Sequence, residues 1–320
     1  MKFSRKILPV LTLAMLAVTA NAQSGCYAPP AGLVSWWPGE GNALDIVSGN
    51  NGTLVGGVTF TNGEVGQAFS FGSGYVSVPH VPAWDFGTNE FTIEFWANFT
   101  STGGAQSFIS CDDGAFGFNK WIFFHGYGVD GLTFHLNGTP GNLTIGNFPF
   151  SPVIGQWYYI ALTRSGPAWT FYVNGASIGT DPSSAVVPSM SQPLTIGNAE
   201  GNFYFNGSLD EVSIYTRALS SNEIAAIYAA GSAGKCSPYS LLEPLIASFN
   251  LAGTNLVINA ANGVAGGTYT VLMSTNVALP LSQWTPVATN VLTGSGNFTI
   301  TVTNAISPGA SQQFYILQAQ

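Results

Sequence analysis

The segment 206–231 constrains the fold of this chain more than any other, because it specifies a turn, a strand and a helix in succession. Val212 and Ile214 alternate with polar neighbours, as a half-buried strand requires. Ser220 precedes Glu223 by three residues, which is the spacing of a capping box at a helix start. The segment therefore predicts a strand followed directly by one short helix.

Most of the remaining chain predicts short strands. Residues 91–99 alternate cleanly between two faces, and 157–163 form a nearly continuous apolar run that suits a strand covered on both faces. Asn174-Gly175 follows the apolar segment 169–173 and is a strong signal for a tight hairpin. Many short strands, frequent turn residues and a single clear helical pattern are typical of an all-β protein.

The segments at 91–96, 157–163 and 171–175, followed by the motif at 206–220, resemble laminin G-like jelly-roll domains in kind and in order. These domains belong to the concanavalin A-like lectin/glucanase superfamily. The resemblance covers residues 26–236 and implies an antiparallel β-sandwich of two packed sheets. It implies a fold and leaves the ligand open.

A second module is predicted at the carboxyl end. Residues 237–244 form a short linker, and residues 245–320 contain five or six short strands. This size favours a small sandwich of immunoglobulin or fibronectin III type with Trp284 in its core. The module resembles small C-terminal β domains of secreted bacterial proteins, which implies a spacer or a surface attachment.

The first 22 residues have the pattern of a secretory signal. Lys2, Arg5 and Lys6 precede an apolar run that is too short for a membrane span, and Ala20-Asn21-Ala22 gives a small-x-small cleavage site. A short membrane anchor is the alternative. No later segment is long and apolar enough to cross a bilayer. We therefore expect a secreted protein, extracellular or associated with a cell surface.

Three cysteines follow the signal, and an oxidising environment favours their pairing. Cys26 opens the first module and Cys236 follows the predicted helix, so we expect a disulfide that joins the two ends of this module. Closing a loop of this length contributes about 5 kcal/mol in the chain-entropy account. Cys111 would then be a buried thiol, although its pairing with one of the other two is the alternative.

The charge balance limits the partners. Beyond the signal, four Lys or Arg residues stand against fifteen carboxylates. Such a chain cannot neutralise a row of phosphates, so nucleic acid is excluded as an expected partner. Anionic polysaccharides and acidic lipid surfaces are disfavoured for the same reason. Neutral carbohydrates, surface glycans, proteins and metal cations remain.

Carboxylates near both ends of the first module predict a structural calcium site. Glu40, Asp45 and Asn50 lie near its start, and Asp210 lies near its end. The resemblance implies that the first and last strands are neighbours, which would bring these oxygen atoms together for Ca²⁺. The alternative is that Asp45 only forms its turn and Asp210 only caps its strand.

Aromatic residues predict a sugar-binding surface, because Trp and Tyr rings stack on the apolar faces of sugars. We expect Tyr127, which lies in a Gly-rich turn, to be the best platform, with Trp121, Trp84 and Asp130 as further ligand-binding residues. Other candidates considered on the same grounds are Trp96, Asn119 and His125. The alternative is that the tryptophans belong to the core of the sandwich.

These observations favour a non-catalytic binding protein that recognises a carbohydrate or a glycosylated or protein surface. A β-glucan hydrolase is the first alternative, because Glu90 and Glu94 share one strand face. The glucanase pattern places an Asp between two such residues, whereas this chain has Thr92 there. A structural adhesin or coat component is the second alternative.

Overall fold

A computed structural model describes residues 26–112, 119–128, 130–138, 141–237, 244–263, 267–294, 296–306 and 312–319. The predicted signal and most of the predicted linker lie outside these residues. The described chain divides into two compact units, and the division falls between Cys236 and Ser237. The helices that the structure describes are all too short or too polar to span a bilayer.

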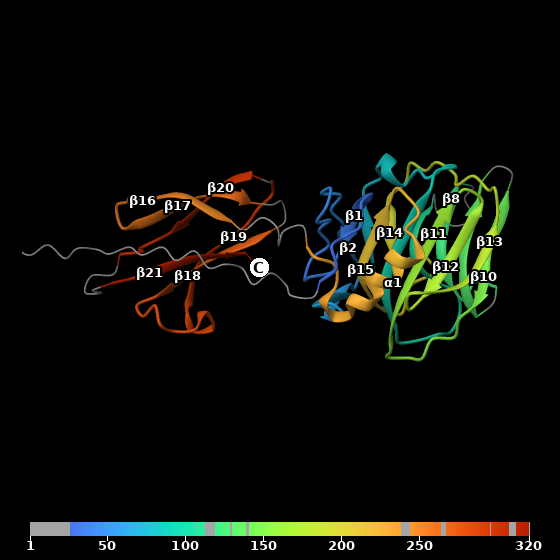
Figure 1. Cartoon of the computed structure of the whole chain (residues 1–320), viewed down its shortest axis with the longest axis horizontal. Helices are drawn as coiled ribbons and strands as arrows, with labels where there is room; N and C mark the ends of the chain where they lie inside the picture. The colour runs from blue at the N-terminus through green and yellow to red at the C-terminus, as the bar shows by residue number, and fades with distance from the viewer. Residues whose placement is uncertain are drawn as a thin grey trace, which may run out of the picture. The chain divides into compact units, whose positions relative to one another are not determined.

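The larger unit consists of two antiparallel β-sheets (Figure 1). The eight-stranded sheet has the order β13 (Ala176–Pro182), β12 (Ala168–Val173), β11 (Trp157–Ser165), β6 (Phe91–Phe99), β15 (Gly207–Tyr215), β4 (Gln67–Phe71) and β3 (Thr59–Asn62), with β1 (Leu33–Trp37) also paired to β15. The seven-stranded sheet has the order β10 (Asn142–Pro149), β9 (Gly131–Asn137), β8 (Lys120–His125), β7 (Gln106–Asp112), β14 (Leu194–Ile196), β5 (Tyr75–Val78) and β2 (Thr53–Val55). The predicted all-β jelly-roll-like sandwich is therefore confirmed.

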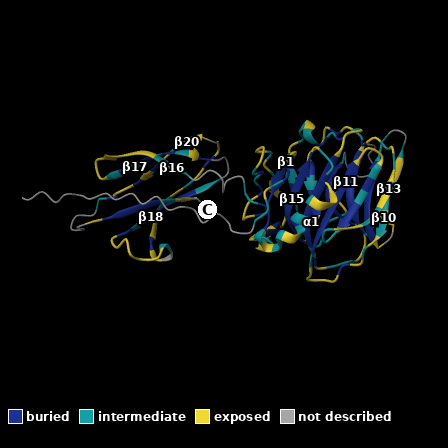
Figure 2. Ribbon diagram, in the orientation of Figure 1, coloured by how far each residue is buried: buried dark blue, intermediate teal, exposed yellow. Residues whose placement is uncertain are grey.

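An aromatic core fills the space between the two sheets (Figure 2). Phe95 of β6 packs against Phe108 of β7 and Phe123 of β8, with ring centroids 4.8 and 5.6 Å away. All the odd-numbered residues of β6 lie in this core, as the alternation predicts. Burying large aromatic side chains in this way removes much apolar surface from water, which stabilises the sandwich.

The tight hairpin between β12 and β13 is also confirmed. Asn174 and Gly175 both have positive φ angles, 50° and 78°, as a two-residue turn of this kind requires. The Asn174 side chain accepts a hydrogen bond from the Tyr159 backbone N–H at 3.0 Å, so it also ties the turn to β11.

The helix α1 (Ser221–Ala230) covers the outer face of the eight-stranded sheet, and a 3₁₀ turn (Gly231–Ala233) follows it. The Ser220 hydroxyl accepts from the Glu223 N–H at 3.3 Å, and the Glu223 carboxylate accepts from the Ser220 N–H at 2.8 Å. The predicted capping box is thus complete. Under the helix, Trp96 is buried against Tyr159 and Tyr228, which explains why β6 is covered on both faces.

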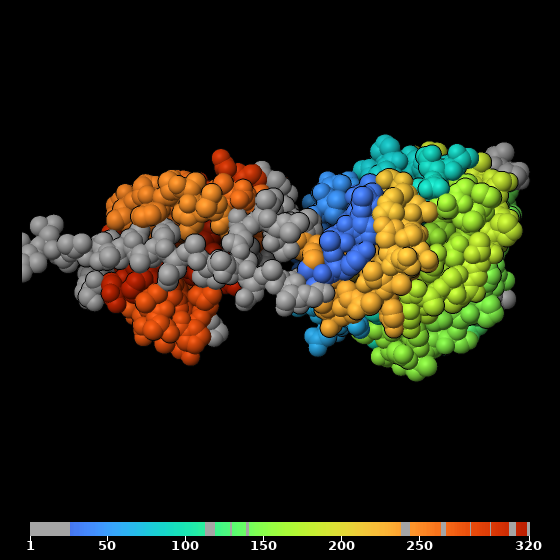
Figure 3. Space-filling view, viewed as in Figure 1, coloured from blue at the N-terminus to red at the C-terminus, as the bar shows by residue number. Residues whose placement is uncertain are grey.

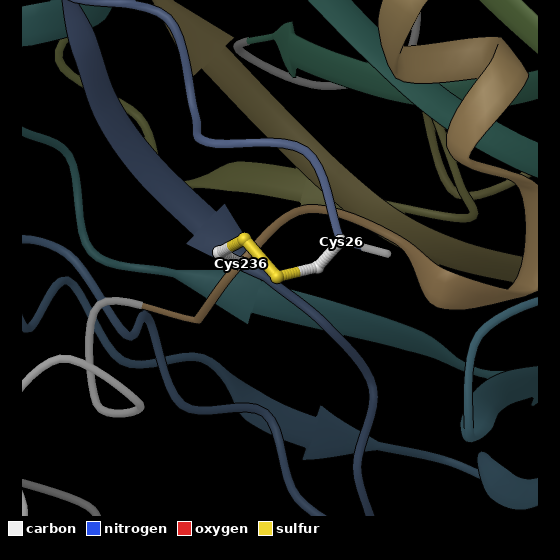
Figure 4. Close-up of a disulfide and its surroundings, with 2 residues drawn as sticks. All are labelled: Cys26 and Cys236. Carbon is white, nitrogen blue, oxygen red and sulfur yellow. A yellow bond between two sulfur atoms is a disulfide. The ribbon is translucent and has the colours of Figure 1, made fainter. Parts of the chain in front are cut away.

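A disulfide joins the two ends of the larger unit. Cys26 and Cys236 are bonded, with their Cα atoms 4.9 Å apart, and Cys111 is a buried free thiol (Figure 4). The predicted pairing is confirmed. Beside the disulfide, Tyr27 pairs with Lys235 in a parallel bridge, and β1 pairs with β15. Figure 3 shows the blue start of the unit side by side with the yellow and orange segment that carries β15 and α1.

The smaller unit contains two three-stranded antiparallel sheets. Their orders are β16 (Leu245–Ala252), β17 (Asn255–Gly263), β20 (Gly296–Val302) and β19 (Thr285–Val291), β18 (Thr268–Ser274), β21 (Phe314–Ala319). The sheets pack through a shared core that includes Ile258, Ile300 and Val271. Trp284 is buried beside Leu272, as predicted. The immunoglobulin or fibronectin III type of this unit stays a prediction.

Candidate functional site

The outward face of the seven-stranded sheet carries the best candidate site. Along β8, the side chains of Trp121 and Phe123 point into the core, whereas Ile122 and Phe124 form a separate cluster on the other face. This arrangement follows from the alternation of side chains in a strand. The outer cluster is completed by Ala199 and by the partly buried Ala105, Tyr127 and Phe203. We call this group the outer-face cluster.

Three aromatic rings dominate the outer-face cluster. The Tyr127 ring lies parallel to Phe124, with centroids 4.7 Å apart and an interplanar angle of 10°. Phe203 meets both rings edge-on, at 5.1 Å from Phe124 and 6.4 Å from Tyr127. Tyr127 is only partly buried, so the stack leaves part of its ring accessible. A flat, supported and accessible ring of this kind suits stacking against a sugar.

Polar contacts hold the loop between β14 and β15 onto this face. The Ser110 hydroxyl lies 2.9 Å from the backbone oxygen of Asn198, and the Thr195 hydroxyl lies 2.7 Å from the same oxygen. Lys120 forms an ion pair with Glu200. The Glu200 N–H also donates to the Asp112 carboxylate at 3.4 Å. These bonds position the loop, and with it Phe203, beside Tyr127.

Two further polar groups on this face are short of hydrogen bonds. His135 Nδ1 and Asn198 Nδ2 are buried and find no hydrogen-bond partner among the described residues. Burial lowers the pKa of His135, and the nearby charge of Lys120 lowers it further. The imidazole is therefore neutral near pH 7. Both nitrogen atoms lie beneath the surface, so the part of this face that a ligand can reach is the partly exposed aromatic stack.

The structure corrects the expectation for the tryptophans. Trp84 and Trp121 are fully buried in the core and cannot act as binding platforms. Trp84 lies in a short 3₁₀ helix (Pro82–Trp84) and packs against Trp37, with ring centroids 6.2 Å apart. Trp121 stacks on Phe134 at 5.7 Å because it occupies an inward position of β8. The core alternative was right for these residues, and it also holds for Trp96.

Asp130 is exposed but faces a different group from Tyr127. One of its oxygens lies 3.2 Å from His125 Nε2, and the other accepts from the Ser151 hydroxyl at 2.6 Å. His125 occupies an inward position of β8 and packs against Phe99, so Asp130 contacts the opposite side of the strand from Tyr127. Asn119 is exposed at the start of β8. Sequence reasoning placed Tyr127 and Asp130 in one site, whereas the structure gives them separate partners.

Several residues in and around the outer-face cluster were not identified from the sequence. Phe124, Lys120 and His135 lie on the outward positions of β8 and β9, but their direction follows only once the inward residues are known. Glu200 and Phe203 come from a loop that is about 80 residues further along the chain. The alternation of Lys120, Ile122 and Phe124 is the one local signal that could have suggested this face.

The predicted calcium ligands fall into two separate environments. Asp45 is buried, and its Oδ1 accepts hydrogen bonds from the backbone N–H groups of Trp36 and Val47, at 2.9 and 3.0 Å. Its Oδ2 accepts from the Asn50 N–H at 3.1 Å. The Asn50 side chain itself donates to Ser35. Asp45 therefore organises its own turn, and this bonding favours the turn-forming alternative for Asp45 and Asn50.

Glu40 and Asp210, in contrast, converge on one turn between β3 and β4. Asp210 accepts from the Val65 N–H at 2.9 Å, and Glu40 accepts from the Gln67 N–H at 3.1 Å. Asp210 Oδ1 is buried and finds no partner in the described part of the chain. Burial raises the pKa of Asp210 well above its ordinary range, and the charges of Glu211 and Glu40 raise it further.

Glu40 and Asp210 alone are better placed to bind a cation than the four predicted ligands together. An unpaired buried oxygen next to a second carboxylate is a favourable place for a hard cation, which would relieve the repulsion. Within the described ranges, however, no group of three or more His, Cys, Asp or Glu side chains is placed to hold a metal ion. Any ion here would take its remaining ligands from backbone carbonyls and water.

The glucanase pair is not assembled. Glu94 is fully buried under α1, where its Oε1 lies 2.9 Å from Lys235 Nζ. Glu90 is exposed and accepts a hydrogen bond from Ser165. Two acids that share a substrate must both reach it, and Glu94 cannot. The proposal that these two residues form a catalytic pair is therefore wrong.

The buried ion pair belongs to a larger polar group near the disulfide. Lys235 Nζ lies 3.3 Å from a carboxylate oxygen of Glu211 and 4.8 Å from the ring centre of Trp36. Glu211 has a positive φ of 59° and sits in a bulge of β15, between the positions that pair with Trp96 and Glu94. The bulge directs the Glu211 carboxylate towards Lys235. Fully buried charges of this kind stabilise the fold only as a complete set.

Comparisons with known proteins support the fold. Residues 70–225 match the family model Laminin_G_3, described as the concanavalin A-like lectin/glucanases superfamily. No curated protein sequence matches this chain significantly. Domain 4 of AbnA, an extracellular GH43 arabinanase from Geobacillus stearothermophilus solved with arabinotriose, is 17% identical, with a TM-score of 0.52 over 62% of this chain and 98% of that one.

Two further solved structures are similar at low identity. A receptor-binding domain is 15% identical, with a TM-score of 0.50 over 84% of this chain and 72% of that chain. The CBM40 domain of the Ruminococcus gnavus IT-sialidase, bound to α2,3-sialyllactose, is 20% identical, with a TM-score of 0.42 over 50% of this chain and 93% of that chain. The similarity to the arabinanase domain and to the receptor-binding domain supports the fold alone and does not identify a ligand.

Proposed function

We propose that the protein is a non-catalytic carbohydrate-binding protein, on the premise that residues 70–225 match the family model of the concanavalin A-like lectin/glucanase superfamily. The observation that carries this proposal is the partly exposed Tyr127 ring stacked on Phe124. Phe203 supports the stack from the side, and an accessible aromatic ring is suited to stacking against a sugar. The similarity to an arabinanase domain solved with arabinotriose is consistent with this role.

The role of Tyr127 can be tested by affinity retention on immobilised polysaccharides. Tyr127→Ala removes the accessible ring, and we expect at least a tenfold loss of affinity, which is about 1.4 kcal/mol. Tyr75→Ala is the matched control, because Tyr75 is a partly buried tyrosine of the same sheet that lies on β5, outside the outer-face cluster. Equal binding by both variants and the unmodified protein would place the binding site elsewhere.

Catalysis is not part of this proposal, because Glu94 is committed to a buried ion pair. A β-glucanase would release reducing sugars from soluble β-glucans. We expect no release together with retention on a polysaccharide column. An adhesin without sugar affinity would show neither release of sugars nor retention on the column, and would instead bind protein or associate with itself.

A structural calcium ion is the second part of the proposal, with Glu40 and Asp210 as its side-chain ligands. When bound, the ion would neutralise the two carboxylates and satisfy the unpaired Asp210 oxygen. The thermal midpoint of unfolding should then fall in a chelator and recover in excess Ca²⁺. Asp210→Asn should abolish this response to Ca²⁺. Asp45→Asn should lower the midpoint but leave the response to Ca²⁺ in place. An identical midpoint with chelator and with Ca²⁺ would exclude the ion.

Export completes the proposed function. The Cys26–Cys236 disulfide is typical of oxidising compartments, and the first 22 residues have the pattern of a secretory signal. We therefore place the protein outside the cytoplasm. Recovery of a chain that begins near Gln23 from the culture medium or cell surface of an expressing bacterium would test this placement.

A further inference from the structure

Every basic side chain of the larger unit is bound by groups of that same unit. Four Lys or Arg residues follow residue 25, and all four are described. Each has a carboxylate or carbonyl partner. These pairs are Lys120 with Glu200, Arg217 with Glu223, Lys235 with Glu94 and Glu211, and Arg164 with the carbonyl oxygens of Gly87 and Ala185.

Lys120 is the one among these four that belongs to the outer face. Its side chain is only 2% exposed, and the side chain of Glu200 is 13% exposed, so the ion pair is shielded from water. Asp112 pairs with Lys120 across β7 and β8, and it also accepts the Glu200 N–H. The Glu200 carboxylate thus balances the charge of the ammonium group. The face has no surplus positive charge to offer a ligand.

The remaining polar groups of this face are neutral. The pKa of His135 is lowered by burial, so its ring is uncharged near neutral pH. The buried amide of Asn198 is uncharged as well. A carboxylate or sulfate on a sugar requires cationic or multiple N–H donors to replace its hydration. The outer face supplies aromatic surface and neutral polar groups in place of such a cation.

We infer that the ligand is a neutral glycan, and that Glu200 sets this specificity by neutralising Lys120. The inference rests on the proposed function, because it concerns the same face. It separates this chain from a binder of sialylated, uronic or sulfated sugars. Glu200 acts here through Lys120 and is a positioning and specificity residue.

A glycan array with matched pairs tests the inference. Each neutral oligosaccharide is printed beside a sialylated, uronylated or sulfated counterpart, and the purified mature protein is applied with Ca²⁺ and with chelator. We expect binding to neutral glycans, with at least a tenfold preference over the acidic counterparts in both conditions. Binding to the preferred neutral glycan should also be nearly unchanged between 0.05 and 0.5 M NaCl, because screening acts only on charged contacts.

The variant Glu200→Gln tests the residue itself. It keeps the shape of the side chain but leaves the charge of Lys120 unbalanced beneath the face, so acidic glycans should gain up to about tenfold in affinity through this charge. Lys120→Gln added to Glu200→Gln should remove this gain. Glu90→Gln is the matched control, because Glu90 is an exposed carboxylate on the other sheet. Circular dichroism must confirm that each variant is folded.

The outcomes separate the inference from the function on which it rests. If no glycan binds, the proposed function is wrong and the inference falls with it. If the unmodified protein binds acidic glycans as well as or better than neutral ones, the function stands and the inference is overturned. A preference for acidic glycans that disappears in chelator would also overturn it, and would assign the contact to a bound ion. Unchanged acidic affinity in a folded Glu200→Gln variant would remove the role of Glu200.

Discussion

Lys235 and Glu94 form an ion pair of 2.9 Å in which neither side chain is more than 1% exposed. Glu94 belongs to β6 and Lys235 to the last residues of the larger unit, and Glu211 of β15 completes the group at 3.3 Å. Removing one member of a buried set leaves the others as uncompensated charges. We therefore expect this group to hold the last residues of the unit against β6 and β15.

Lys235→Met should lower the free energy of unfolding by about 3–5 kcal/mol, because it leaves two carboxylates buried without a cation. Arg217→Met is the control. The Arg217–Glu223 pair is about one third exposed, so its loss should cost no more than about 1 kcal/mol. Urea denaturation followed by tryptophan fluorescence measures both. Similar losses in the free energy of unfolding for the two variants would show that the buried group contributes no more to stability than the exposed pair does.

The stability of the larger unit should fall as the pH rises from 5 to 8. Burial raises the pKa of Glu211 from its ordinary 4.5 to about 7, despite the opposing charge of Lys235. The folded protein thus holds this proton more tightly than the unfolded chain does. The resulting stabilisation is complete below pH 4.5 and is lost as the pH rises through 7. The raised pKa of Asp210 acts in the same direction.

Thermal scans in chelator across this pH range test the expectation. Glu211→Gln should flatten the decline, because the neutral amide cannot titrate. Glu223→Gln is a control of the same chemistry, since Arg217 lowers the pKa of Glu223 to about 2. The stabilisation by Glu223 is present above pH 4.5 and is lost only as the pH falls towards 2. A Glu211→Gln variant that keeps the full slope between pH 5 and 8 would contradict the assignment.

Loss of the disulfide should destabilise the larger unit by about 2–5 kcal/mol. The double variant Cys26→Ser with Cys236→Ser removes the bond without leaving a reactive thiol. Its midpoint should match that of the reduced protein.

Burial raises the pKa of Cys111 to about 12, so this thiol should resist alkylation until the protein unfolds. Rapid alkylation of Cys111 in the native protein would show that the core opens easily.

Ser220→Ala should cost about 0.5–2 kcal/mol, because it removes the hydroxyl that accepts the Glu223 N–H at the start of α1. Ser221→Ala, one residue further along, is the control. Ser221 is exposed within the helix, where alanine is a better helix former. The difference in urea midpoint between the two variants measures the cap. A smaller effect at Ser220 than at Ser221 would contradict the capping role.

Features set by neighbouring residues were predictable from the sequence. The capping box depends on two residues three positions apart, and the β12–β13 hairpin on Asn174-Gly175. The disulfide was predicted from the position of its two cysteines at the ends of one module. In each case a short range of chain, or the compartment of the protein, carries the physical reason.

Features that depend on which face of a strand is covered were harder to predict. Trp121 and Phe124 lie three positions apart in β8, yet one is in the core and the other is under Tyr127. Composition cannot distinguish them, because both faces of this strand carry aromatic residues. The contact of Lys120 with Glu200 depends on how β14 is placed beside β7. Such a contact follows from the sheet order, which the sequence does not state.

The calcium prediction illustrates the same limit. Asp45 and Asp210 are both acidic residues in turns or at strand ends, and they looked equivalent in sequence. Asp45 receives several backbone N–H groups from its own turn, whereas Asp210 keeps an unpaired oxygen. The number of donors that surround a carboxylate decides whether it can accept an ion, and that number depends on the folded backbone.

The covalent link between residues 26 and 236 has a consequence for an exported protein that meets proteases. A single cut in any surface loop between these positions leaves the two fragments bonded, and the smaller unit, which starts one residue after Cys236, stays attached to both. Nicked molecules should therefore migrate as an intact chain until a reducing agent is added. One such cut would therefore leave both units in a single covalently linked molecule.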